Sequence, residues 1–141
     1  MKKSVYFCLV LLVVLNNSCS RFKQQQKKIV GTWKVDVVRI EDGEGFLFYD
    51  SLAEGNFTFH TDLINGQSAY KYSYFGQYEV VDSVVFNNLK YSLGAKGEVL
   101  QIERPTDTLV AKIILLTSDR LTFEYYDFLQ YRLKRFSCVK N

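Results

Sequence analysis

Apolar and polar residues alternate with a period of two through most of the chain after Ile29. The pattern is clearest in the ranges 33–37, 70–74 and 109–115, where every second residue is aliphatic or aromatic. Such alternation is typical of a β-strand with one buried face and one face in solvent. No segment of this region has a convincing helical period, so we expect an all-β domain.

Turn signals divide the region into about eight to ten strands. Asn65-Gly66 is the strongest, because both central positions of a type I′ turn need positive φ, and Asn87-Asn88 is a second. Residues 46–53 fit either a short helix or a strand. Many short strands joined by short turns indicate an antiparallel meander, and a small barrel is favoured over a sandwich because closure removes exposed edges.

The first eighteen residues have the three parts of a signal peptide. Two lysines precede a twelve-residue apolar run from Ser4 to Leu15, and Asn16, Asn17 and Ser18 follow it. Twelve helical residues span about 18 Å, well short of a hydrocarbon core of roughly 30 Å. A stable transmembrane helix is therefore not expected, and an uncleaved N-terminal anchor is the alternative.

Cys19 follows this apolar run directly after a small residue. The arrangement resembles the lipobox of bacterial lipoproteins, although Asn16 stands where that motif usually has Leu. The resemblance implies that Cys19 is lipidated and becomes the new N-terminus. We accordingly divide the chain into a signal peptide (1–18), a lipidated tether (19–28) and a β-barrel domain (29–141).

The formal net charge of +3 comes from the first 28 residues. From Ile29 onward the sequence has 12 basic and 15 acidic residues, a balance of −3. A nucleic-acid-binding face is therefore not expected. After cleavage and lipidation only Cys138 would be a free thiol, so no disulfide is expected within the domain.

The run Ile29-Val30-Gly31-Thr32-Trp33-Lys34 resembles the opening motif of lipocalins. With the leader, the strand pattern and Tyr131-Arg132-Leu133-Lys134 near the end, the chain is similar to the lipocalin-like lipoproteins of Bacteroidetes. The resemblance implies that an arginine of the last strand stacks over Trp33. Arg135 is the better candidate and Arg132 the second. The absence of an acidic residue just after Cys19 implies a periplasm-facing protein.

Trp33 also has a physical interpretation that needs no family. A large ring on the inward face, just after Gly31, which lets backbones approach closely, would plug one end of the barrel.

Aromatic side chains are the feature with most functional promise. An eight-stranded barrel is either just filled by its own side chains or holds one small ligand. Rings with polar tips would suit a small apolar or amphipathic ligand. The alternative is a filled barrel that docks a protein or glycan on its outer face, with outward tyrosines as an interface. The candidate lining residues are Tyr70, Tyr72, Tyr74, Phe57, Phe59, Tyr91 and Phe123.

Residues for catalysis or metal binding are sparse. His60 is the only histidine, and we expect it to be exposed at the end of a strand. Cys138 is expected to lie beyond the last strand as an idle thiol. The sequence has no G-x-S-x-G and no phosphate-cradling glycine loop. We therefore expect no enzyme activity, no cofactor and no metal; the expected partner is a membrane, through the N-terminal lipid.

Overall fold

A computed structural model describes residues 22–45, 47–74 and 78–141; within these ranges, the side chains of 47–52, 72–74, 78–80 and 95 lie outside the description. A short helix spans residues 22–29, and a single 3-10 turn, η1, spans Ala95–Gly97. Nine strands make up the rest: β1 Gly31–Asp42, β2 Leu47–Leu52, β3 Glu54–Phe59, β4 Leu63–Tyr74, β5 Tyr78–Gly94, β6 Val99–Glu103, β7 Thr108–Leu116, β8 Arg120–Asp127 and β9 Arg132–Lys140.

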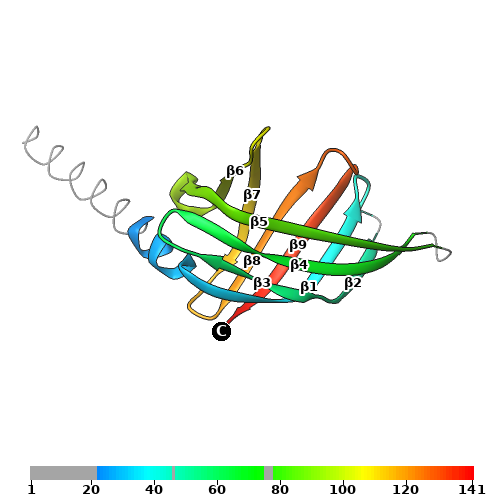
Figure 1. The fold of residues 1–141 in the computed structure, drawn as a ribbon, viewed down its shortest axis with the longest axis horizontal. Coiled ribbons are helices and arrows are strands. Elements are labelled where there is room, and N and C mark those ends of the chain that lie inside the picture. Colours follow the sequence, from blue (N-terminus) through cyan, green and yellow to red (C-terminus); the bar gives the residue numbers. More distant parts are fainter. Residues whose placement is uncertain (1–21, 46, 75–77) are drawn as a thin grey trace, which may run out of the picture.

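The strands form a closed antiparallel meander barrel (Figure 1). The first half of β1 pairs with β3 and its second half with β2, so β2 and β3 act as one strand bent at Ala53. Each later strand pairs with the next, and β9 returns to pair with β1. The predicted lipocalin-like, all-β meander barrel is therefore confirmed, with eight strands around the barrel, and residues 47–52 of the ambiguous segment form a strand.

The two predicted Asn-containing turns are wrong as chain reversals. Asn65-Gly66 lies inside β4, and Asn87-Asn88 lies opposite it inside β5. The register passes from Ile64↔Leu89 to Gly66↔Phe86, so two residues of β5 face one of β4. This is a β-bulge, which bends and twists the pair. Asn88 has φ 50° and Gly66 has φ 128°. These residues therefore have the positive φ that the turn prediction required, but they bend the strand pair instead of reversing the chain.

Gly66 is required at this bend because another strand backbone lies against it. A Cβ built on Gly66 would lie 2.0 Å from the carbonyl oxygen of Asn56 in β3. The position also makes room for rings, since its cross-strand partners are Phe57 and Phe86, whose centroids are 5.3 Å apart.

The last strand extends further along the chain than the position expected for Cys138 implies. Residues 128–131 form a turn, and β9 then runs to Lys140. The inward positions are Lys134, Phe136 and Cys138, all buried. Cys138, predicted beyond the last strand, therefore faces the core.

The helix covers one end of the barrel, and it comprises most of the segment that we had interpreted as a polar tether. Phe22, Gln25 and Ile29 are spaced as one helical face, with Ile29 fully buried and Phe22 packed against the core. The indole Nε1 of Trp33 donates a 2.6 Å hydrogen bond to the carbonyl oxygen of Ile29. Trp33 itself is fully buried, which fixes the helix to the barrel. No helix among the described residues is long and apolar enough to cross a membrane.

The meander gives the barrel two different ends. The helix, the turns at 60–62, 95–98 and 117–119, and the final residue lie at the "closed end" (Figure 1, lower left). The turns at 43–45, 104–107 and 128–131 lie at the opposite end, which we call the "open end".

Replacing Trp33 should test the plug at the closed end. Trp33→Ala is expected to lower the free energy of unfolding by about 3–5 kcal/mol, because a large buried ring is lost. Trp33→Phe keeps a ring but leaves the Ile29 carbonyl without its donor, which costs about 1–3 kcal/mol. Urea unfolding measures both changes. Equal stability of Trp33→Phe and the parent would contradict a structural role for the indole hydrogen bond.

Candidate functional site

The interior of the barrel is occupied by aromatic rings in mutual contact. Phe136 is the hub: its ring centroid lies 5.3 Å from that of Phe123, 5.8 Å from Phe57 and 6.0 Å from Tyr70. Tyr125 stacks on Phe136 at 6.1 Å. Each such pair stabilises by about 0.5–1.5 kcal/mol beyond the area that it buries. The rings therefore form one packed cluster through the middle of the barrel.

A second ring contact lies nearer the closed end. Phe59 and Tyr91 meet edge to face at 5.2 Å, and the Tyr91 hydroxyl donates a 2.6 Å hydrogen bond to the carbonyl oxygen of His60. Burial, with the negative charge of Asp62, raises the pKa of Tyr91 to about 12. Tyr91 is thus a neutral donor that fastens the turn at 60–62.

The residues predicted to line a ligand cavity are inward where the structure describes their side chains. Phe57, Phe59, Tyr70, Tyr91 and Phe123 are all buried, with at most 7% of each exposed, and pack on other rings. The side chains of Tyr72 and Tyr74 lie outside the described residues. The inward placement agrees with the prediction, and the contacts between rings are those of a packed core.

Two surface pockets lie on the outer wall of the barrel. One, of about 360 Å³, lies where the helix meets β7 and is lined by Gln25, Gly97, Lys112 and neighbouring residues. The other, of about 470 Å³, lies beside the bend between β2 and β3. Neither is lined by the aromatic cluster.

The cation over Trp33 is Lys140, so the prediction of Arg135 is wrong. The Lys140 Nζ lies 4.8 Å from the centre of the Trp33 ring and donates a 3.1 Å hydrogen bond to the carbonyl oxygen of Lys28. The register of β9 on β1 is the cause, because Trp33 faces Lys140 while Arg135 faces Arg39, nearer the open end. Arg135 instead donates to Glu124 at 2.8 Å.

Gly31 makes room for this lysine. A Cβ built on Gly31 would lie 2.7 Å from Cε of Lys140, and its φ of 133° is one that L side chains rarely adopt. The Gly-x-Trp motif thus accommodates the side chain of Lys140, where we had expected a close approach of backbones and an arginine over the ring.

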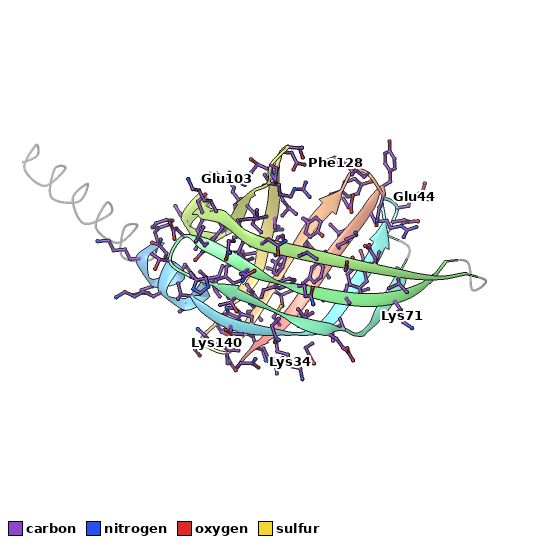
Figure 2. The ribbon with its side chains drawn as sticks, viewed as in Figure 1. Lys34, Glu44, Lys71, Glu103, Phe128 and Lys140 are labelled. Carbon is purple, nitrogen blue, oxygen red and sulfur yellow. The ribbon has the colours of Figure 1, made fainter. Side chains whose placement is uncertain are left out.

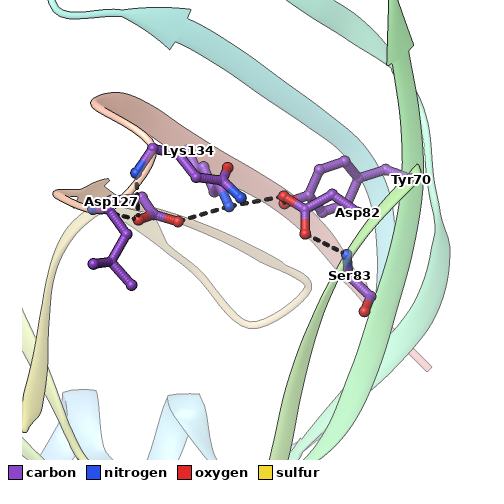
Figure 3. Close-up of polar contacts among 7 residues, drawn as sticks. Tyr70, Asp82, Ser83, Asp127 and Lys134 are labelled. Atoms are coloured by element: carbon purple, nitrogen blue, oxygen red, sulfur yellow. Dashed lines mark hydrogen bonds and ion pairs between the residues drawn. The ribbon is translucent and has the colours of Figure 1, made fainter. Parts of the chain in front are cut away.

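A layer of charges lies inside the barrel toward the open end. Lys134 is 3% exposed, and its Nζ lies 2.9 Å from a carboxylate oxygen of Asp82 in β5 and 2.9 Å from one of Asp127 in β8 (Figure 3). The Tyr70 hydroxyl donates to the same Asp82 oxygen at 3.1 Å. Four strands are therefore joined by one polar layer above the aromatic cluster.

Burial opposes ionisation of both aspartates, but the Lys134 ammonium outweighs it, so the pKa of Asp82 and that of Asp127 lie below the usual value. Both carboxylates are thus ionised at neutral pH. Sequence reasoning missed it, since three isolated charged residues far apart in the chain look like solvent-facing positions.

The turn at 128–131 projects from this layer and is unusually apolar. Phe128, Leu129 and Tyr131 are 77%, 94% and 73% exposed. Asp127 Oδ1 accepts hydrogen bonds from the backbone N–H groups of Leu129 and Gln130, at 3.0 and 3.2 Å. Tyr131 has φ 54°, a strained conformation for a bulky residue. We call Phe128, Leu129 and Tyr131 the "apolar tip".

Other reactive residues are placed as follows. His60 is exposed at the end of β3, as predicted. Burial, with the charge of Asp36, raises the pKa of Cys138 to about 12, which keeps its thiol protonated. The described residues contain no group of three or more His, Cys, Asp or Glu that would hold a metal. Neither a protein-family model nor a curated protein sequence matches the chain.

A double-mutant cycle should identify the cation over Trp33. The cycle of Trp33→Leu with Lys140→Met is expected to give a coupling energy of about 0.5–2 kcal/mol, the range of cation–π contacts. The matched cycle of Trp33→Leu with Arg135→Met should give a coupling near zero. Both are measured by urea unfolding. Greater coupling to Arg135 than to Lys140 would contradict the observed register.

Removing Lys134 should destabilise the fold, because Asp82 and Asp127 would lose the cation that compensates their desolvation. At pH 7, Lys134→Met is expected to lower the free energy of unfolding by about 2–4 kcal/mol, somewhat below the range for a fully buried pair because the carboxylates are partly exposed. Arg104→Met, which breaks the exposed pair with Asp107, is the control and should cost less than about 1 kcal/mol.

The pH dependence of this loss has a definite sign. The folded-state pKa values of Asp82 and Asp127 are lowered, so their contribution is complete above the unfolded value of about 3.9 and disappears as the pH falls through the folded values. The difference between the parent and Lys134→Met should therefore shrink on acidification. A difference that stays constant down to about pH 3 would contradict the proposed ion layer.

Proposed function

We propose that this chain is a lipid-anchored, lipocalin-like protein of the bacterial cell envelope that binds a partner protein through the open end of a filled barrel. The observation that carries the proposal is the apolar tip. Its three residues are large and more than 70% exposed, and they fill three of the four positions of the turn at 128–131, where turns ordinarily have Gly, Asn, Asp or Ser.

The tip is held in one conformation rather than left loose. Asp127 accepts from two backbone N–H groups of the turn with one oxygen and is fixed by Lys134 through the other. The Phe128 ring rests edge to face on Tyr126, with centroids 5.0 Å apart. An ordered tip loses little conformational entropy on binding, which favours affinity.

The energy available from the tip is adequate for specific binding. Fully burying a Phe or Leu side chain contributes about 1.5–3 kcal/mol, and aromatic side chains are enriched at protein interfaces. A patch of this kind on the surface of a small domain is characteristic of an interaction site.

The packed interior favours an outer binding surface over a deep ligand cavity. Phe57, Phe123 and Phe136 contact one another in the middle of the barrel, and the Lys134 layer covers them toward the open end. The proposal therefore places binding on the rim and uses the barrel as a rigid support, with no catalytic role.

The membrane anchor is supported by the leader and by Cys19, which lie outside the described residues. The lipobox-like position of Cys19 and the lipocalin-like opening motif are the sequence features that support it. The absence of an acidic residue just after Cys19 is the feature that supports a periplasm-facing protein.

A small apolar or amphipathic ligand is the second candidate. The specific observation in its favour is the polar layer of Lys134, Asp82 and Tyr70 at the open end, which offers charged and hydrogen-bonding groups to the head of an amphipathic molecule. Such a ligand would bind above this layer, not among the rings.

Site-specific photo-crosslinking in cells should test the tip. A crosslinker at Leu129 is expected to give a discrete protein adduct, and Phe128→Ser should lower its yield at least tenfold because an anchor side chain is lost. A crosslinker at Val81, an outer-wall residue that is 67% exposed, is the control. The thermal stability of Phe128→Ser should match the parent, since its ring is largely in solvent.

Equal labelling from Leu129 and Val81 would contradict a binding role for the tip. Native mass spectrometry of protein purified from envelope extract distinguishes the second candidate. A defined excess mass that leaves on denaturation would indicate a small ligand. The soluble form used must begin before Phe22, because the helix is part of the folded body.

A further inference from the structure

The closed end carries a strong excess of positive charge. The helix contributes Lys23, Lys27 and Lys28. The neighbouring strand ends and turns contribute Lys34, Lys90, Lys96, Lys112, Arg120 and Lys140. The acidic residues beside these nine basic ones are Asp62, Glu98 and Asp119 in the turns, Asp36 two residues after Lys34, and Glu124 opposite Lys112, which leaves a balance of +4.

The open end has the opposite balance. The turns and strand ends there contain Arg104 and Arg132 against five acidic residues. Those five are Asp42, Glu44, Glu103, Asp107 and Asp127. In Figure 2, Lys34 and Lys140 lie along the lower edge of the molecule, and Glu44 and Glu103 lie along the upper edge.

The charges at the two ends also differ in their pairing. Toward the open end, Arg39, Arg104, Lys134 and Arg135 each form an ion pair with a carboxylate. None of the nine basic residues of the closed end forms an ion pair with another described residue. Lys140 is held over Trp33 and on the carbonyl oxygen of Lys28, and the charge of the other eight is available to a partner outside the chain.

Apolar side chains lie among these cations. Val30, Ile114 and Leu115 are 37%, 45% and 41% exposed, beside the helix and at the end of β7. Lys112 lies in the pocket between the helix and β7, next to Ile114. Cations surrounding a few exposed aliphatic side chains are the combination found on surfaces that rest on anionic bilayers.

We propose that the closed end is a membrane-docking surface, which rests on anionic phospholipid headgroups and directs the apolar tip away from the bilayer. Anionic headgroups complement the unpaired cations, and Ile114 and Leu115 enter the interface between headgroups and acyl chains. The orientation rests on the proposed lipid anchor, since the helix that follows Cys19 lies at this end. The docking surface itself does not require the lipid.

Vesicle binding by a soluble form isolates this surface from the anchor. Residues 19–141 with Cys19→Ser contain the helix and every strand. We expect this form to sediment with vesicles of equal parts phosphatidylglycerol and phosphatidylcholine, and not with phosphatidylcholine alone. Raising the salt from about 0.1 M to about 1 M shortens the screening length from about 10 Å to about 3 Å and should release the protein.

Matched charge variants locate the surface. The triple variant Lys27→Gln, Lys96→Gln, Lys112→Gln should lower vesicle partitioning on the order of 100-fold, as expected for three charges near an anionic surface. The control Arg39→Gln, Lys71→Gln, Arg104→Gln removes the same net charge toward the open end and should change partitioning less than about threefold. Melting curves confirm that both variants stay folded.

Three results would overturn the proposal: no binding of the parent to the anionic vesicles, an equal loss in both triple variants, or a loss caused by Phe128→Ser with Leu129→Ser. The last result would make the tip the membrane contact. Radiolabelled palmitate on the full chain in cells tests the anchor separately. Labelling at Cys19 without vesicle binding would reject the docking surface and keep the anchor, whereas vesicle binding without labelling would do the reverse.

Discussion

The pairing of β9 with β1 is the constraint on which the rest of the structure depends. It closes the sheet, so that neither of these strands is left with an unpaired edge along this seam. Its register also sets which side chains meet. With Trp33 opposite Lys140, the lysine lies over the indole and reaches the end of the helix. A slip of one residue would turn Lys140 outward and bring Arg135 inward, because successive side chains of a strand face opposite sides.

The same register determines which residues of β9 face inward, and these residues lie in successive layers of the interior. Its inward positions are Cys138, Phe136 and Lys134, from the closed end toward the open end. Phe136 joins the ring cluster, and Lys134 collects two carboxylates from strands that are far apart in sequence. A buried lysine costs desolvation energy unless it is paired, so Asp82 and Asp127 must be positioned for it. Asp127 then also organises the turn, so the geometry of the tip is coupled to the closure of the barrel.

Period-two alternation was sufficient to predict the fold because it is strong in most strands. Phe57, Tyr91 and Phe123 each have another large apolar residue two positions away, Phe59, Leu93 and Leu121, so their inward direction could be predicted. Between residues 129 and 138 the alternation was ambiguous: Leu129, Tyr131 and Leu133 form one alternating set, and Phe136 and Cys138 the other. The sequence favoured the wrong set because Lys134 looks like a solvent residue until its partners are known. Choosing the wrong inward-facing set led to the wrong assignment of Arg135 as the cation over Trp33.

The two Asn-containing segments were correctly predicted to include residues at positive φ, but the prediction that they reverse the chain was wrong. Asn65-Gly66 and Asn87-Asn88 do include residues at positive φ, yet they face each other across β4 and β5 as a bulge. Only the long-range pairing decides between a bend and a reversal. The helix at 22–29 was missed for a different reason, since Phe22 and Ile29 are its only large apolar residues and most of its stability comes from docking on the barrel.

The two ends of the barrel differ in which side chains are left without partners within the chain. Ion pairs toward the open end neutralise its cations, which leaves the apolar tip as the feature there that a partner would recognise. At the closed end the cations other than Lys140 form no ion pair with a described residue, so an external anion can pair with them. The cations of the closed end and the apolar tip of the open end would therefore bind different partners, the first by electrostatic attraction and the second by burial of apolar surface. A rigid barrel between them keeps the two contacts apart and fixes their relative direction.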